Sequence, residues 1–254
     1  MTDEEISSGD NIFSPELVGL EINTMFTSSD GALRFITAYD PSDDTVVASF
    51  RGTINAEDWL YDLETFKTNP YVDSPEVYVH KGFYESYSAM KDEVSRSLAA
   101  LSDEKGTNKV KITGHSLGAA QAMLLAYDMA KGNIHSLSAL EVTSMYTFGC
   151  PRVGDASFAS SVRSLNMVHN RVVHHRDIVP HVPTSGPLMA FEHTAREVYY
   201  EDEEWTPGKF TLCSDKDGED DNCSRSLWSY SVQDHCEYVG VEICSPVAES
   251  LFSS

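Results

Sequence analysis

The pentapeptide Gly114-His-Ser-Leu-Gly118 constrains the fold of this 254-residue chain more than any other feature. It stands between a β-branched segment, residues 110–113, and an apolar helical segment, residues 117–131. A serine on a tight strand-to-helix turn has strained backbone geometry, and glycines flank it because a Cβ there would clash between strand and helix. The pentapeptide alone is a weak signal, but its setting predicts that Ser116 is a nucleophile at the start of a helix.

Strand-like segments alternate with helical ones along the chain. Strand patterns occur at residues 33–38, 45–50, 77–80, 110–113, 144–148, 171–175 and 198–201, and helical patterns at 84–101 and 117–131. This alternation predicts an α/β fold with a largely parallel central sheet and helices on both faces. Lys109 and Lys111 are more polar than a fully covered central strand requires, which indicates a partly open sheet face.

Length and composition fit one domain over residues 1–254. With 41% hydrophobic residues the chain can bury a sizeable core without obligatory metals or disulfides. It contains no run of 18 apolar residues, so no transmembrane helix is expected. Forty acidic residues against 18 basic ones give a net charge of −22, which argues against nucleic acid or an anionic membrane surface as a partner.

The cysteines indicate one disulfide. Cys213 and Cys223 bracket a short polar loop that has no packing of its own, so we expect a bridge there, although five reduced thiols are the alternative. Such a bridge is worth a little under about 3 kcal/mol and requires an oxidising compartment. Cys150 resembles a small buried hydrophobe, and the sequence assigns no partner to Cys236 or Cys244.

The start of the chain and the acidic run inside the cysteine loop lead to two further expectations. No signal peptide is visible at the start, which fits either a cytosolic protein or a mature secreted chain. The acidic run 215–221 does not fit an EF-hand, because Asp220 stands where the turn glycine belongs, so no metal site is predicted.

A serine nucleophile needs a histidine to take its proton and a carboxylate to orient that histidine. In hydrolases whose serine stands on such a strand-to-helix turn, the three residues follow in the order serine, acid, histidine along the chain. Asp177 follows the strand-like segment 171–175 and would lie at a strand's carboxyl end, where α/β sites assemble. Asp155 is the alternative acid, but its setting is more typical of a turn or a helix cap.

Three histidines follow these acids. His181 lies four residues after Asp177 between prolines, which makes folding back onto that carboxylate unfavourable. His193 enters a strand-like stretch and fits an ordinary structural role. His235 follows the last strand-like hairpin and is best placed to reach Ser116.

An ordered set of motifs resembles the fungal-type (class 3) triacylglycerol lipases, a family that also includes feruloyl esterases. The motifs span residues 33–240 and are Phe50-Arg-Gly-Thr53, His80-Lys-Gly-Phe83, Gly114-His-Ser-Leu-Gly118, Thr147-Phe-Gly-Cys-Pro-Arg-Val-Gly154, Asp177-Ile-Val-Pro180 and Asp234-His235. The resemblance implies an α/β-hydrolase fold with a short lid helix, and Ser116, Asp177 and His235 as the catalytic triad. Cys150 and Cys236 depart from the expected pattern, but neither departure removes a reactive group.

Two further assignments concern the oxyanion hole and the lid. One oxyanion donor is expected from the N–H of Leu117, the residue after the nucleophile, and the resemblance implies Thr53 as the other. In this family the segment after the Thr53 position is the lid. Trp59, Leu60 and Leu63 share one helical face there, and that face either covers the site until lipid is met or packs as ordinary core.

The motifs together predict a serine carboxylic-ester hydrolase that forms an acyl-enzyme on Ser116 and needs no cofactor. Acylglycerol esters at an oil–water interface are the favoured substrates, because the candidate lid is aromatic and aliphatic. A feruloyl-type or other soluble-substrate carboxylesterase is the first alternative. A catalytically silent binding protein on the same fold is the second, and the intact triad and oxyanion motifs count against it. The expected bridge favours secretion or another oxidising compartment.

Overall fold

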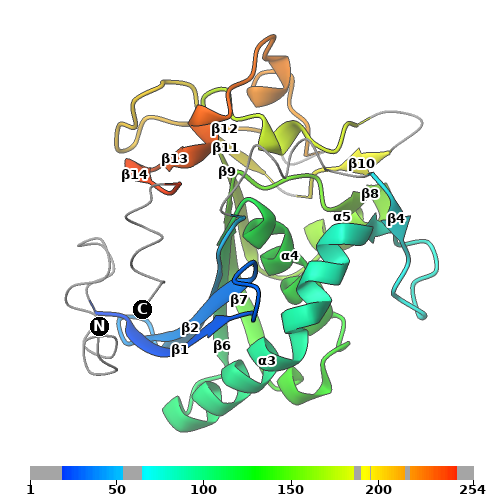
Figure 1. The fold of residues 1–254 in the computed structure, drawn as a ribbon, viewed down its shortest axis with the longest axis vertical. Helices are drawn as coiled ribbons and strands as arrows, with labels where there is room; N and C mark the ends of the chain where they lie inside the picture. The colour runs from blue at the N-terminus through cyan, green and yellow to red at the C-terminus, as the bar shows by residue number, and fades with distance from the viewer. Residues whose placement is uncertain (1–18, 54–64, 186–189, 195, 215–217, 245–254) are drawn as a thin grey trace.

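The computed structural model describes residues 19–53, 65–185, 190–194, 196–214 and 218–244, and a mixed sheet dominates it (Figure 1). The eight strands of this sheet follow the order β1-β2-β3-β6-β7-β9-β11-β12. Their bounds are β1 Glu21–Thr27, β2 Arg34–Asp40, β3 Thr45–Phe50, β6 Lys109–His115, β7 Glu141–Phe148, β9 Val168–His174, β11 Glu197–Tyr200 and β12 Thr211–Leu212.

The central strands of the sheet are parallel, as the alternating pattern predicts. β3, β6, β7, β9 and β11 pair in parallel, whereas β1, β2 and β12 join antiparallel at the two edges. Because the carboxyl ends of parallel strands meet at one edge, the loops after β6, β7 and β9 lie together. Expected segment 77–80 forms only the short strand β5 (Val79–His80), which lies in a separate four-stranded sheet.

Three helices are described, and all of them lie on the same face of the main sheet (Figure 1). They are α3 (Lys81–Lys105), α4 (Leu117–Ala130) and α5 (Ala156–Arg163). The alternating pattern predicts helices on both faces, and the described part of the chain differs from this prediction. The opposite face accommodates the polar residues of β6: Lys111 is half-buried and pairs with Asp40 at 3.1 Å and Asp43 at 2.5 Å.

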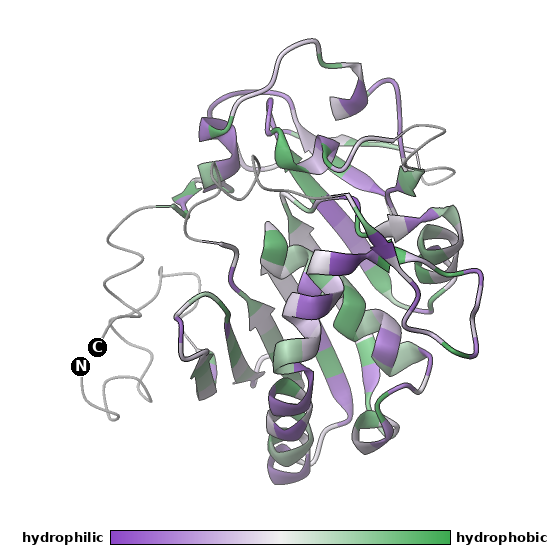
Figure 2. Cartoon of the chain, turned by 45° about the vertical axis from the view of Figure 1, so that its right-hand side comes forward, coloured by the Kyte–Doolittle hydropathy of each residue, from purple (hydrophilic) through white to green (hydrophobic). Residues whose placement is uncertain are grey.

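The main core fills the space between the sheet and these helices. Figure 2 shows apolar residues along the central strands and on α4, while α3 carries polar residues on its outer side. Every residue of α4 except its last is buried, so this helix is enclosed between the sheet, α3 and α5. The Tyr127 ring on α4 lies 5.1 Å from the Phe158 ring on α5, which joins the two helices.

Short strands and 3₁₀ turns complete the described structure outside the main sheet and the three helices. They are β4 (Lys67–Thr68), β8 (Gly154–Asp155), β10 (Phe191–Glu192), β13 (Glu237–Tyr238), β14 (Val241–Glu242), and the 3₁₀ turns η2 (His135–Leu137), η3 (Val179–His181), η4 (Ser224–Ser226) and η5 (Gln233–Cys236). Among the described helices, none has the length and apolarity that crossing a membrane requires.

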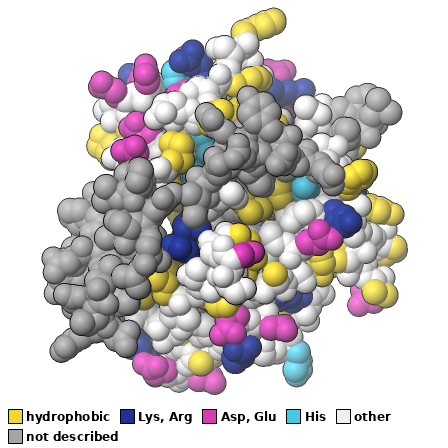
Figure 3. Space-filling model, viewed as in Figure 1, with side chains coloured by type: hydrophobic (Ala, Val, Ile, Leu, Met, Phe, Trp, Pro, Cys, Tyr) yellow, Lys and Arg dark blue, Asp and Glu magenta, His cyan; other side chains and the backbone are white. Residues whose placement is uncertain are grey.

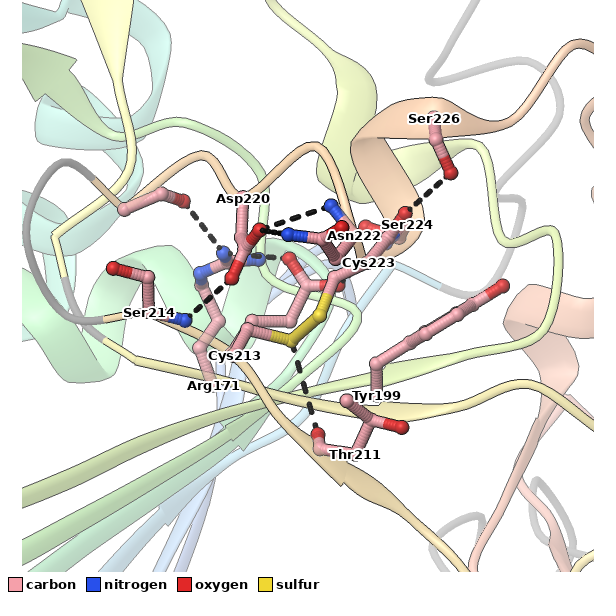
Figure 4. Close-up of a disulfide and its surroundings, with 12 residues drawn as sticks. Arg171, Tyr199, Thr211, Cys213, Ser214, Asp220, Asn222, Cys223, Ser224 and Ser226 are labelled. Carbon is pink, nitrogen blue, oxygen red and sulfur yellow. Dashed lines mark hydrogen bonds and ion pairs between the residues drawn. A yellow bond between two sulfur atoms is a disulfide. The ribbon is translucent and has the colours of Figure 1, made fainter.

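The structure contains two disulfides. Cys213 is bonded to Cys223, the pair that the sequence analysis expects, and the bridge closes a loop above the buried side chain of Arg171 (Figure 4). Cys236 is bonded to Cys244 across the ends of the β13–β14 hairpin, a pairing that the sequence left unassigned. Cys150 is buried and free. Two disulfides are consistent with an oxidising compartment.

Candidate active site

Ser116 occupies the sharp turn between β6 and α4. Its backbone has φ 58° and ψ −127°, a strained conformation for a residue with a side chain. A Cβ on Gly114 would lie 2.3 Å from the carbonyl oxygen of Gly118, and a Cβ on Gly118 would lie 2.3 Å from that of Phe50. Both glycines are therefore sterically required, and the turn has the geometry of a nucleophile elbow.

Asp177 and His235 are hydrogen-bonded to each other in the buried interior of this region. His235 Nδ1 lies 2.9 Å from Asp177 Oδ2, and both side chains are fully buried. Asp177 lies just beyond β9, and His235 lies in η5. Asp177 Oδ1 accepts a 2.8 Å bond from the N–H of Val179, and Oδ2 also accepts a bond from the hydroxyl of Tyr238. One carboxylate thus receives three donors.

The charge state of this pair follows from its surroundings. Burial by itself would raise the pKa of Asp177, but the adjacent His235 and the bonds from His235, Tyr238 and Val179 outweigh it, so the pKa is lowered. An ionised Asp177 accepts a hydrogen bond from the Nδ1–H of His235, which leaves Nε2 as the ring nitrogen that can take a proton. Burial, followed by the Asp177 charge, raises the pKa of Tyr238 well above its usual value, so its phenol remains a donor.

Ser116 and His235 are brought to the same place through their neighbours. The ring of His115, the residue before Ser116, stacks on the ring of His235 with centroids 4.4 Å apart. His115 Nε2 also lies 2.9 Å from the backbone oxygen of His235. Within the described part of the chain, neither Ser116 Oγ nor His235 Nε2 has a hydrogen-bond partner, and both atoms are buried. These are the two atoms between which a general base would move a proton, and such bonds often tighten only when substrate is bound.

His115 itself is electrically neutral. Burial, and next the neighbouring His235, lower the pKa of His115 to about 3. A carbonyl oxygen can only accept, so the contact to His235 requires the proton of His115 on Nε2. The ring therefore supports His235 without placing a positive charge beside it.

The loop that carries His235 is fixed to the loop that carries Asp177. The N–H of Ser231 donates to the oxygen of Arg176 at 2.7 Å, and the N–H of Ile178 donates to the oxygen of Ser231 at 3.3 Å. Asp234 Oδ2 accepts a 3.0 Å bond from the N–H of Arg176. Two segments that are distant in sequence are thus joined by backbone bonds directly beside the Asp177–His235 pair.

The alternative acid and bases occupy other positions. Asp155 caps α5 by accepting a 2.9 Å bond from the N–H of Phe158. His193 is buried with Nε2 2.6 Å from the backbone oxygen of Pro180, and the His181 ring packs against Tyr230 at 4.5 Å. In the described chain, none of these three residues forms a hydrogen bond with Asp177 or His235 through its side chain.

The expected oxyanion donors lie on the two segments nearest the serine. Leu117 begins α4, so its N–H has no acceptor within the helix. A Cβ on Gly52 would lie 2.8 Å from Ser116 Cβ, which shows how closely the chain beside Thr53 passes the serine. The expected lid residues Trp59, Leu60 and Leu63 lie outside the described residues.

The structure adds site residues that the sequence analysis did not identify. Tyr238 bonds to Asp177, His115 stacks on His235, and a Cβ on Gly149 would lie 2.8 Å from atoms of both Asp177 and His235. Two of them had a signal in the sequence: His115 is the second residue of the elbow, and Gly149 lies in the motif Thr147–Gly154. The roles of Tyr238 and Gly149 depend on contacts across the fold, which no local pattern encodes.

A metal centre has little support in the described chain. The ligand atoms of Glu197, Cys213 and Cys223 lie within 4.8 Å of one another, but the two sulfurs are joined in a disulfide and are therefore not thiolates.

A parallel sheet with a strained serine after one strand, an acid after a later strand and a histidine beyond both defines the α/β-hydrolase class. Comparison with known proteins identifies the family. The model of the class 3 lipase family matches residues 47–186, and the chain belongs to this family.

Individual relatives agree with this membership. A lipase of Rhizomucor miehei is 35% identical over 207 residues, which are 81% of this chain and 55% of the relative. A triacylglycerol lipase whose catalytic centre is formed by a serine protease triad superposes with a TM-score of 0.79 at 28% identity, covering 96% of this chain and 98% of that one. A fungal lipase–inhibitor complex that led to a model for interfacial activation superposes with a TM-score of 0.76 at 31% identity, covering 89% and 84%. The chain spans about half the length of the curated relatives it matches, 55% and 54% for two of them.

Proposed function

We propose that this chain is a serine carboxylic-ester hydrolase, and specifically a triacylglycerol lipase. The observation that carries the proposal is the buried 2.9 Å bond between His235 and Asp177 beside the strained Ser116. Membership of the class 3 lipase family supports it, as does similarity to a triacylglycerol lipase with a serine protease triad.

The reaction passes through an acyl-enzyme. His235 Nε2 takes the proton of Ser116 Oγ as that oxygen attacks the ester carbonyl, and Asp177 stabilises the imidazolium that forms. The N–H of Leu117 and the Thr53 segment stabilise the oxyanion. Collapse of the tetrahedral intermediate releases the alcohol, which takes the proton from His235. Water then attacks the acyl-enzyme by the same steps and releases the acid.

Acylglycerol esters at an oil–water interface are the proposed substrates, with Trp59, Leu60 and Leu63 as the apolar face of a lid. The amphipathic sequence of this segment and similarity to a lipase studied for interfacial activation support the proposal. A feruloyl-type esterase is the alternative. Trp59→Ser should depress hydrolysis of a long-chain triglyceride emulsion far more than hydrolysis of p-nitrophenyl acetate. Parallel loss of both activities, together with a lower melting temperature, indicates a core helix instead and favours the esterase.

The central experiment compares purified variants on a soluble p-nitrophenyl ester. Ser116→Ala should lower kcat by about 10⁶, and His235→Ala should be similarly severe, because triad members act as a unit. His193→Ala is the matched control: it removes another buried histidine and should retain kcat. Turnover by Ser116→Ala close to the parent level contradicts the proposed function.

We also propose that residues 1–254 form one domain and that the protein is secreted. The continuous core between sheet and helices supports the first proposal. The two disulfides support the second.

A further inference from the structure

The most exposed hydrophobic side chain that the structure describes belongs to Trp228, between η4 and η5. Its relative exposure is 100%, and Tyr230, two residues later, is 45% exposed. We call residues 227–230 the aromatic tip. Figure 3 shows hydrophobic side chains projecting at the top of the molecule, where Figure 1 places this orange segment. Tryptophan is highly buried on average, so complete exposure to water is unusual for this residue.

The exposure of Trp228 is not a consequence of a loose loop, because both ends of the tip are fixed. On the entry side, Cys223 is disulfide-bonded, and the N–H of Ser224 donates to the buried Glu197 carboxylate at 3.0 Å (Figure 4). The N–H of Leu227 then donates to the oxygen of Ser224 at 3.1 Å. The backbone therefore presents the tryptophan in a defined position.

The exit side is fixed just as firmly. The ring of Tyr230 packs on His181 at 4.5 Å, and its hydroxyl bonds to the oxygen of Leu227 at 3.4 Å. Ser231 forms a β-bridge with Asp177. A backbone held at both ends needs little further ordering when the tip enters a second phase, which favours binding.

The aromatic tip lies next to the candidate active site. Trp228 is three residues before Ser231, and an extended chain covers at most about 3.5 Å per residue, so its backbone lies within roughly 10 Å of Ser231 and the adjacent Asp177 strand end. The aromatic tip therefore lies in the same part of the molecule as the Asp177–His235 pair.

The chemistry of the tip selects a neutral surface. Tryptophan and tyrosine favour the boundary between apolar and aqueous phases, because each has an apolar ring and a polar group. The nearby Arg225 is paired with Asp221 at 3.3 Å and with the oxygen of Glu219 at 3.4 Å, so its charge is already matched. The chain as a whole carries −22, which repels an anionic surface.

We propose that the aromatic tip anchors the protein to a neutral lipid–water interface, with Trp228 inserted into it. The proposal rests on the proposed lipase function, and it is separate from the lid: the anchor holds the molecule on the surface while the lid controls access. The partner is an uncharged or zwitterionic lipid surface, and a second copy of the chain is the alternative occupant to be tested.

The test measures partition onto triolein droplets coated with phosphatidylcholine, with full chains carrying Ser116→Ala so that the surface is not consumed. Trp228→Ser should lower the partition coefficient at least about tenfold, equivalent to about 1.4 kcal/mol. Trp228→Phe should lose less. Val72→Ser is the matched control, because Val72 is 93% exposed in the loop before β5, and it should remain within twofold of its parent. A Trp228→Ser value within twofold of its parent overturns the proposal.

Two further outcomes decide the partner. Added phosphatidylglycerol should weaken binding at low salt, and strengthening instead contradicts a neutral surface. If sedimentation shows self-association that Trp228→Ser abolishes while partition is unchanged, the tip is a contact between copies and the proposal fails.

With Ser116 intact, Trp228→Ser should cleave p-nitrophenyl acetate within twofold of wild type. Absence of that activity in wild type would contradict the lipase, while the partition experiment would still decide the anchor.

Discussion

At the scale of single residues, the candidate site is a set of buried polar groups whose protonation states are set by their neighbours. Asp177 accepts three hydrogen bonds, His235 is directed by one of them, and Ser116 Oγ remains unbonded in the described structure. In a buried site each donor to an ionised carboxylate is worth more than in water. Removing one donor should therefore have a measurable effect on turnover.

Tyr238→Phe removes the hydroxyl that bonds Asp177 while keeping the ring that packs in the site. A hydrogen bond to a charged group is worth about 1.5–3 kcal/mol, so kcat on a soluble ester should fall roughly tenfold or more. Tyr199→Phe is the control, because in the described chain its hydroxyl bonds the oxygen of His175 at 3.2 Å and not Asp177. Equal kcat in Tyr238→Phe and wild type would mean that the Tyr238 bond does not support Asp177.

The lowered pKa of Asp177 also predicts a dependence of stability on pH. Because the folded pKa lies below the ordinary value of 3.8, the unfolded chain binds more protons in that range, and folding stability falls as pH drops from about 3.8 through the folded pKa. Asp177→Asn cannot ionise, so its melting temperature should fall less between pH 5 and pH 3 than that of wild type. Equal falls in a thermal unfolding series would show that Asp177 contributes nothing to acid sensitivity.

At the scale of elements, short turns and staples bring the site residues together. The turn after β7 passes so close to the Asp177–His235 pair that only a residue without a Cβ fits at Gly149, where φ is 55°. The His235 turn is followed at once by Cys236, which is bonded to Cys244. These two features lead to separate predictions.

Gly149→Ala should abolish most turnover, because its Cβ would lie 2.8 Å from Asp177 Oδ2 and from His235 Cε1 and Nδ1. We expect kcat on a soluble ester to fall at least about a hundredfold, the scale on which small misplacements act. Gly132→Ala is the matched control: φ is 74° there, but nothing lies within 4 Å of the added Cβ. That variant should lose some stability and keep its kcat. Similar kcat in both variants would contradict the steric account.

The two disulfides should contribute similarly to the free energy of unfolding, but only one of them should affect turnover. Loops with sequence separations of 10 and 8 give about 2.7 and about 2.5 kcal/mol by the chain-entropy model. Replacing either pair with serines should therefore lower the free energy of unfolding by similar amounts. Only loss of the Cys236–Cys244 pair should also lower kcat, several-fold, since Cys236 follows His235. Denaturant unfolding and ester kinetics on both double variants test this, and unchanged kcat without the second bridge would contradict it.

At the scale of the whole molecule, the sequence predicted the central strands and α4 better than the edge strands. The central strands and α4 follow from strong local periodicity, and the mixed, largely parallel sheet was confirmed. Edge strands β1 and β12 were missed because their residues are mostly half-buried or exposed and lack a hydrophobic pattern. The one-sided placement of the described helices depends on tertiary packing, and only the lysines of β6 hinted at it.

The candidate site also contains residues that the sequence predicted and residues that it did not. Ser116, Asp177 and His235 could be selected because chain order and sheet position restrict the choice, and the structure places the last two in contact. Tyr238 and the Cys236–Cys244 bridge could not, since their partners are set by how loops from different strands meet. The expected lid at Trp59, Leu60 and Leu63 remains a prediction.

The central claim, that Ser116 is a nucleophile activated by His235, is tested most directly by labelling with a p-nitrophenyl alkylphosphonate. Attack of Ser116 Oγ on phosphorus displaces p-nitrophenolate and leaves a stable adduct in place of the acyl-enzyme. The account predicts about one equivalent of p-nitrophenol per chain, a single adduct located on Ser116 by peptide mass spectrometry, and little labelling of His235→Ala. An adduct on another residue, or labelling of His235→Ala at the wild-type rate, would contradict it.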